Sequence, residues 1–343
     1  MGLVIKPGDK KLMLNIILII SVTAFFIYSY LKAEMALKDI HGAEWITFDT
    51  EGRLYFIYQG NVYRLNLNDD TLIKLIETDI EVSSGDIIDI AVNSSGNIFL
   101  TDPKSREVHI YSPSGELVRK LQGHFKENAK IAVDDKTIYL ADMQGNRVIA
   151  LNIENGAILW IDMDYLIPDS LDVRDVIVYV SDKDKKLVRL LNKEDGQVID
   201  NIKLGLSGYT YGSTILSLDN NEILLAQTYS RNGLLHKFSH QGKIIQTIRG
   251  PDGFSPSDLT MTPKGDIVVT DDSNFSFYYV KGNLASPFQF NQVEKLFEND
   301  RKKKLSLQRS SLFSGIVLIF CLIWLIGIFV YYKKSSGSTP VKR

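Results

Sequence analysis

The feature that most constrains this chain is a short pattern that recurs along most of its length. An apolar stretch, a turn that closes on glycine and a second apolar stretch occur together at 46–54, 90–98 and 259–267. The second stretches recur as well, and they end at Tyr58, Asp102, Asp142, Asp182, Gln227 and Asp271. The intervals between these residues are 44, 40, 40, 45 and 44. We therefore expect each repeat to be a small antiparallel sheet of four strands.

The repeat length also predicts how these sheets pack. Each sheet carries apolar residues on both faces, for example Ile138, Tyr139 and Leu140 in the third repeat, so it needs a neighbour on each side. Repeats of this length with four strands indicate a β-propeller. A β-helix would have a shorter repeat, and two separate sandwiches would not keep one period. We count six blades, at 44–80, 86–123, 128–165, 169–206, 211–250 and 255–291.

Two uncharged apolar runs flank the repeats, at residues 12–31 and 312–332. A helix of either length spans roughly the 30 Å hydrocarbon core of a bilayer. A cleaved signal peptide is the alternative for the first run, but the run is too long and lacks a small-x-small cleavage site. A buried core helix is the alternative for the second. The predicted fold is thus all-β, a six-bladed propeller flanked by two transmembrane α-helices, the first acting as an uncleaved signal-anchor.

The charges around the first apolar run predict its orientation. Lys6, Lys10 and Lys11 precede the run, and fewer basic residues follow it, which places the N-terminus in the cytoplasm. Charges on the two sides of the second run cancel. We expect cytoplasmic tails at 1–11 and 333–343, the latter disordered, and a propeller at the extracytoplasmic cell surface.

The segment 292–311 joins the repeats to the second apolar run. We expect a short juxtamembrane helix that ends in a basic cluster, with a solvated spacer as the alternative. The cluster would contact lipid headgroups, since each basic residue adds about 1 kcal/mol at an anionic surface. Its members are Arg301, Lys302, Lys303 and Lys304.

The second and third repeats resemble a known family. "IAVNSSGNIFLTDPKSREVHIYSPSGELVRKL" (90–121) and "IAVDDKTIYLADMQGNRVIALNIENGAILWI" (131–161) resemble the NHL repeat, including Asn146-Arg147 after the loop. The resemblance implies a six-bladed propeller and specifies the fold better than the function. Propellers of this type also resemble two groups of enzymes. The first group is the calcium-dependent lactonases and strictosidine-synthase-like proteins, and the second is the zinc-dependent peptide-amidating lyases.

Both groups need polar residues from the innermost strands in the central channel. Here the expected channel residues are Asp89, Lys130, Ser170 and Asp258. Two carboxylates with a lysine do not make a calcium site, which needs six to eight oxygens. His109 and His236 fall in third strands, away from the channel. We expect no catalytic residue, no metal and no cofactor. A membrane-anchored, metal-dependent hydrolase or lyase of the lactonase type stays open as the alternative.

The polar loops between second and third strands should open on one face, and they carry both basic residues and aspartates. Local ion pairs that fix the loops are one interpretation, and such surface pairs contribute only about 0–1 kcal/mol each. The other is a binding face for a protein or an acidic polysaccharide, with nucleic acid not expected outside the cytoplasm. The candidate binding residues are Arg106, Arg147, Lys186, Tyr229 and Arg231. We expect a non-catalytic scaffold or receptor subunit.

Overall fold

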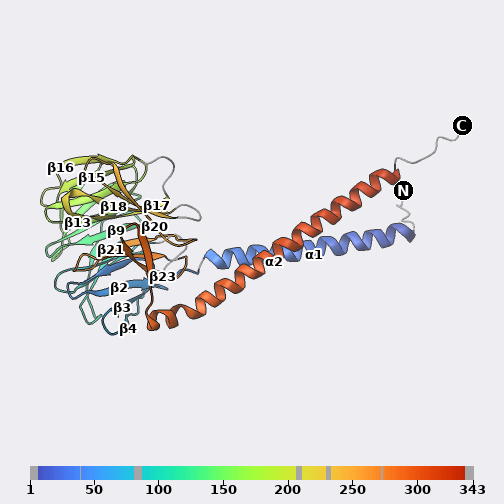
Figure 1. Ribbon diagram of the computed structural model, residues 1–343, viewed down its shortest axis with the longest axis horizontal. Coiled ribbons are helices and arrows are strands. Elements are labelled where there is room, and N and C mark those ends of the chain that lie inside the picture. Colours follow the sequence, from blue (N-terminus) through green and yellow to red (C-terminus); the bar gives the residue numbers. More distant parts are fainter. Residues whose placement is uncertain are drawn as a thin grey trace. The chain divides into compact units, whose positions relative to one another are not determined.

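The computed structural model describes residues 7–38, 40–80, 87–205, 211–228, 233–271 and 273–336, drawn as a ribbon in Figure 1. It divides into two compact units. One unit contains most of the two terminal helices, and the other, His41–Phe297, contains the strands.

The strands of the second unit follow one another in antiparallel groups of four. The first three groups are β1 Ile46–Phe48, β2 Arg53–Tyr58, β3 Asn61–Asn66, β4 Thr71–Ile76; β5 Ile90–Val92, β6 Ile98–Asp102, β7 Glu107–Tyr111, β8 Leu117–Gln122; and β9 Ala129–Val133, β10 Thr137–Asp142, β11 Arg147–Asn152, β12 Ile158–Asp162. The others are β13 Pro168–Arg174, β14 Ile177–Asp182, β15 Leu187–Asn192, β16 Val198–Lys203; β17 Tyr211–Ser217, β18 Ile223–Thr228, β19 Leu234–Phe238, β20 Ile244–Arg249; and β21 Asp258–Met261, β22 Ile267–Asp271, β23 Ser276–Lys281, β24 Leu284–Phe288. A short 3₁₀ helix, Asp219–Asn221, separates β17 from β18.

Four of these groups are separate four-stranded sheets, in the order of the sequence. The last two groups join into one eight-stranded sheet, through a single parallel pairing of Arg249 with Leu284. Glycines with positive φ close many of the tight turns, as at Gly96 (φ +78°) between β5 and β6 and Gly115 (φ +88°) between β7 and β8. Glycine adopts this conformation without steric cost, which explains why these positions recur in the sequence.

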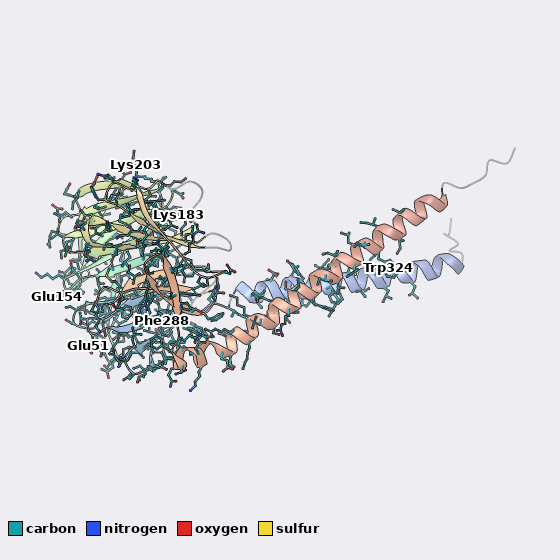
Figure 2. All side chains as sticks on the ribbon, viewed as in Figure 1. Glu51, Glu154, Lys183, Lys203, Phe288 and Trp324 are labelled. Carbon is teal, nitrogen blue, oxygen red and sulfur yellow. The ribbon has the colours of Figure 1, made fainter. Side chains whose placement is uncertain are left out.

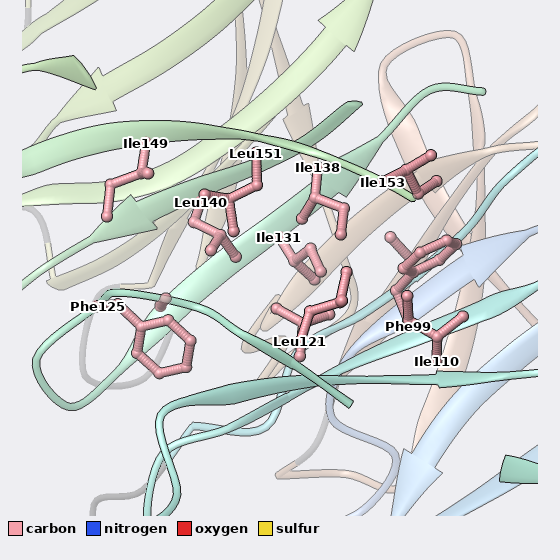
Figure 3. Close-up of a cluster of buried hydrophobic side chains, with 13 residues drawn as sticks. Phe99, Ile110, Leu121, Phe125, Ile131, Ile138, Leu140, Ile149, Leu151 and Ile153 are labelled. Atoms are coloured by element: carbon pink, nitrogen blue, oxygen red, sulfur yellow. The ribbon is translucent and has the colours of Figure 1, made fainter. Parts of the chain in front are cut away.

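Neighbouring groups bury apolar clusters between them. Figure 3 shows the cluster between the second and third groups, where Phe99 and Ile110 face Ile138 and Leu140. Similar clusters lie between the first and second, third and fourth, fourth and fifth, and fifth and sixth groups. Full burial of each such side chain contributes roughly 1.5–3 kcal/mol. Each sheet is therefore covered on both faces by its neighbours, and the architecture fits a β-propeller.

The last group also packs against the first. The Phe56 ring on β2 lies 5.5 Å from the Phe277 ring on β23. Phe297, which is fully buried, lies 4.8 Å from Tyr58 and 6.3 Å from Phe56, measured between ring centroids. Phe297 belongs to the first turns of helix α2, so this segment is part of the strand unit and not a free linker.

The two helices are α1, Pro7–Lys38, and α2, Asn291–Ser336. Helix α2 has 46 residues, about 69 Å, with no break where the sequence suggested a boundary between a juxtamembrane helix and an apolar span. Residues 333–336 form the end of α2. Residues 337–343 lie outside the described residues.

The helix unit meets the length and composition expected of membrane spans. Runs within Ile17–Leu37 and Asn291–Ile328 are long and apolar enough to cross a bilayer. Inside this unit the Phe26 and Phe313 rings are 5.9 Å apart, and Ser311 Oγ donates a hydrogen bond to Glu34 Oε1 at 2.5 Å. A polar contact of this kind can join two apolar helices.

Candidate functional site

The innermost strand of every group lines one cavity of about 160 Å³, which is the central channel of the strand unit. At one mouth of this channel, each group supplies one side chain from an equivalent position, the residue just before Ile46, Ile90, Ile131, Leu171, Ile215 or Leu259. We call this set the channel ring: Trp45, Asp89, Lys130, Ser170, Thr214 and Asp258. The sequence predicted Asp89, Lys130, Ser170 and Asp258 at the channel, and the structure confirms that they line it.

Sequence reasoning missed Trp45 and Thr214 in the ring. The repeat contained the signal, because Trp45 precedes Ile46 as Asp89 precedes Ile90. The strand registers agree with this equivalence, since Ile46 pairs with Phe56 as Ile90 pairs with Leu100.

Three ring residues accept hydrogen bonds from the next group. Asp89 Oδ2 accepts from Ile131 N at 2.8 Å, and Ser170 Oγ accepts from Ile215 N at 3.1 Å. Asp258 Oδ2 accepts from the N–H of Ile46 at 2.7 Å, which joins the last group to the first. These polar side chains therefore hold neighbouring innermost strands together. A buried acceptor–donor pair of this kind typically contributes about 0.5–1.5 kcal/mol, and more when charged.

Lys130 places a cation between the acidic members of the ring. Its Nζ atom lies 3.5 Å from Asp89 Oδ1 and 3.0 Å from the centre of the Trp45 ring. Lys130, Asp89 and Asp258 are only 5–7% exposed, so their charges are compensated mainly by one another. The indole Nε1 of Trp45 is buried and has no hydrogen-bond partner among the described residues.

Asp258 has the most perturbed acidity in the ring. Burial raises the pKa of its carboxyl to about 7, Lys130 opposes this rise, and the neighbouring Asp89 adds to it. Deeper in the channel, burial also raises the pKa of Asp172, whose Oδ2 accepts from Ser217 N at 2.7 Å and from Ser217 Oγ at 2.6 Å. All three channel carboxyls, those of Asp89, Asp172 and Asp258, therefore accept hydrogen bonds from protein donors.

The residues that the structure describes contain no cluster of three or more His, Cys, Asp or Glu side chains suited to a metal ion. His109 lies on β7 and His236 on β19, both third strands of their groups, as the sequence predicted. Burial lowers the pKa of both imidazoles. Nothing among these residues provides the oxygen-rich or histidine-rich set that a catalytic calcium or zinc requires.

A second candidate surface is the loop face, which we define as the loops joining second to third strands and the connections from one group to the next. Buried aspartates at the ends of second strands organise it. Asp142 Oδ1 accepts from Gly145 N in a loop at 2.8 Å and from Lys126 N in a connection at 3.2 Å. Asp182 accepts in the same way from Lys185 N and Leu166 N.

The predicted binding residues occupy different positions on this face. Arg147 begins β11, where its Nε donates to Asp142 Oδ2 at 2.9 Å and its Nη2 donates to the His124 carbonyl at 2.6 Å. Arg106 and Lys186 are exposed and have positive φ. Arg106 is equivalent to Asn146 and not to Arg147, because Asp102 pairs with Glu107 as Asp142 pairs with Arg147. Of the two arginines, only Arg147 has its guanidinium bound within the loop.

The remaining predicted site residues divide between two places. Tyr229 and Arg231 lie outside the described residues. The residues predicted to contact lipid headgroups lie on α2, where Lys302 Nζ forms an ion pair with Glu298 Oε1 at 2.5 Å. The other three members of that cluster are Arg301, Lys303 and Lys304.

Comparisons with known proteins agree with the fold. The structure of a streptogramin B lyase matches with a TM-score of 0.55 and 13% identity, over 72% of this chain and 83% of that one. Virginiamycin B lyase from Staphylococcus aureus matches with a TM-score of 0.53 and 13% identity, over 73% and 85%. No protein-family model and no curated protein matches the sequence. Identity this low supports a shared propeller-like fold and no shared activity.

Proposed function

We propose that the chain is a membrane-anchored, six-bladed NHL-type propeller that binds a partner and does not catalyse a reaction. The six groups of strands, each with one residue in the channel ring, support the blade count. Two apolar helices support the anchoring, and the basic residues before the first support cytoplasmic termini with an extracytoplasmic propeller.

The observation that supports a binding role over a catalytic one is that the channel-ring carboxylates bind backbone groups of neighbouring blades. Asp89 and Asp258 accept backbone N–H groups of neighbouring blades, and Lys130 lies beside Asp89. A catalytic carboxylate has to be available to a substrate or a metal. In this channel ring, Asp89 and Asp258 instead join neighbouring blades, so their carboxylates are not available to a substrate.

The binding surface of this proposal is the loop face. Arg106 and Lys186 present exposed cationic side chains there, which suits an acidic partner such as an acidic protein patch or polysaccharide. Arg147 would act by positioning the loop through Asp142 and His124. Tyr229 and Arg231 stay predictions of the sequence.

Acidic polymers can test this surface. Polyglutamate and hyaluronate would serve as probes with the purified full chain in detergent. The double variant Arg106→Glu, Lys186→Glu should bind about tenfold more weakly at low salt, because two attractive charges become repulsive. The matched control is Lys136→Glu, an exposed lysine in the β9–β10 turn on the opposite face. Equal loss in both variants would contradict a loop-face site.

The second candidate is a metal-dependent hydrolase or lyase working in the channel. Both structures named above are lyases, but at 13% identity the likeness extends to the fold and not to the activity. Elemental analysis of the full chain separates the two. A binding propeller should contain no stoichiometric calcium or zinc, and chelator should not change its melting temperature. A stoichiometric metal whose removal lowers that temperature would overturn the first candidate.

A further inference from the structure

Both chain ends of the strand unit lie on the loop face. At the start, Glu44 N donates to the Ile57 carbonyl at 2.9 Å, at the end of β2. At the other end, the Phe297 ring packs 4.8 Å from Tyr58 and 5.8 Å from Phe275, which lies in the loop between β22 and β23. The chain therefore enters and leaves this unit through one face.

The course of helix α2 agrees with this exit. Its first N–H, at Asn291, donates to Asp70 Oδ2 at 2.9 Å, and Asp70 lies in the β3–β4 turn on the opposite face. Two turns later, Phe297 has reached the loop face. The uncharged run of α1 ends at Leu31, thirteen residues before Glu44, and that of α2 begins at Leu312, fifteen residues after Phe297, so a short segment joins each run to the loop face.

The chemistry of the loop face suits a lipid surface. Met163 and Leu166, in the connection between β12 and β13, are 64% and 51% exposed. Four basic side chains are exposed on the same face, Lys104, Arg106, Lys126 and Lys186, alongside the acidic Glu77, Asp79, Glu127, Asp184 and Asp252. Asp164, between the two apolar side chains, is bound by Lys185 Nζ at 2.6 Å and by Arg189. Exposed apolar side chains beside cations are typical of surfaces that dip into an anionic bilayer interface.

The opposite face is predominantly acidic. Its turns expose acidic side chains that an anionic bilayer would repel, and Figure 2 labels two of them, Glu51 and Glu154, on the side away from Lys183. The exposed acidic residues of these turns are Glu51, Asp69, Glu116, Asp135, Glu154, Asp175, Glu194, Asp195, Asp219 and Asp266, against three exposed lysines, Lys136, Lys243 and Lys264.

We infer that the loop face docks on the anionic headgroup layer of the membrane that holds the two helices. Met163 and Leu166 enter the interface, and Arg106, Lys126 and Lys186 contact lipid phosphates. The inference rests on the proposed membrane anchoring, and it assigns the loop face to lipid headgroups in place of the acidic protein or polysaccharide considered above. The acidic face then points toward the solvent.

Site-specific fluorescence on the full chain tests this arrangement. In a Cys321→Ser background, one cysteine is placed at Met163 and, as the matched control, at Val176 in the β13–β14 turn, which is 59% exposed on the opposite face. Each variant is labelled with an environment-sensitive dye and reconstituted into phosphatidylcholine vesicles, with or without phosphatidylglycerol. Headgroup-nitroxide lipid should quench position 163 at least about twofold more than position 176, and more strongly with phosphatidylglycerol.

Charge reversal provides the second arm of the test. Arg106→Glu with Lys126→Glu and Lys186→Glu should remove the extra quenching caused by phosphatidylglycerol, and Lys136→Glu should not. Equal quenching at positions 163 and 176 would overturn the inference while the chain stays in the vesicles. Binding of polyglutamate or hyaluronate that shields position 163, with no lipid quenching, would assign the face to a soluble partner instead. A chain that carbonate extracts from the vesicles would overturn the membrane anchoring itself, and the inference with it.

Discussion

The ammonium group of Lys130 lies 3.0 Å from the centre of the Trp45 ring, and so the third strand group contacts the first across the channel mouth. The same ammonium is 3.5 Å from Asp89 on the second group. Besides the effect of burial, the pKa of Asp258, on the last group, is lowered by the charge of Lys130 and raised by that of Asp89. One buried cation thus contacts side chains of the first and second groups, and its charge also lowers the pKa of Asp258 on the last group.

Removing this cation should be costly. Lys130→Met leaves buried carboxyls without compensation, and we expect the free energy of unfolding to fall by about 3–5 kcal/mol at neutral pH. Chemical denaturation followed by circular dichroism would measure it. Lys136→Met, at an exposed turn, is the control and should change stability by less than about 0.5 kcal/mol. Adding Asp89→Asn to Lys130→Met should restore part of the lost free energy of unfolding. If the double variant is no more stable than Lys130→Met, the charge explanation is wrong.

The raised pKa of Asp258 predicts a pH dependence. The folded protein holds a proton there up to about pH 7, whereas the unfolded chain releases it near pH 4. The folded state therefore binds more protons between these values, so this group makes stability fall as pH rises from about 4 to 7 and adds no further change above. Asp258→Asn keeps an acceptor for Ile46 N and should remove this contribution. Its melting temperature relative to the parent chain should rise with pH across that window. A constant difference would refute the assignment.

The two arginines of the loop face should differ in their effect on folding. Arg147→Ala removes hydrogen bonds to the buried Asp142 and to the His124 carbonyl, and we expect it to lower stability by about 1–3 kcal/mol. Arg106→Ala, with an exposed side chain, should stay within about 0.5 kcal/mol. Thermal unfolding of the full chain in detergent compares them, and equal effects would show that the loop does not depend on Arg147.

Two turn glycines with similar backbones make a matched pair. Both have positive φ, +76° at Gly242 and +87° at Gly265. A Cβ at Gly242 would lie 1.9 Å from the Lys203 carbonyl oxygen on the neighbouring group, whereas one at Gly265 would meet nothing within 4 Å. Gly265→Ala should therefore cost only about 1–2 kcal/mol of backbone strain. Gly242→Ala should cost about 1–3 kcal/mol more, because the neighbouring group has to move. Similar losses in denaturant midpoint would argue against this close approach.

Much of the strand unit could be predicted from the repeat. The regular intervals placed the second strands, and four of the six channel-ring residues followed from their position before an innermost strand. The binding face was harder to predict. Arg106 and Arg147 look alike in sequence, yet a one-residue offset at the start of the third strand leaves one exposed and ties the other to Asp142.

The sequence by itself determined the strands, their turns and the apolar helices, because apolar alternation, turn glycines and run length act over a few neighbouring residues. Tertiary structure alone decided that Lys130 rests on Trp45, that Phe297 fills the space between the first and last groups, and that Asp258 binds the N–H of Ile46, 212 residues away in the chain. Contacts of this kind arise only when the ring closes. Their strength depends on burial and on distance in space, and neither quantity is a property of a local stretch of sequence.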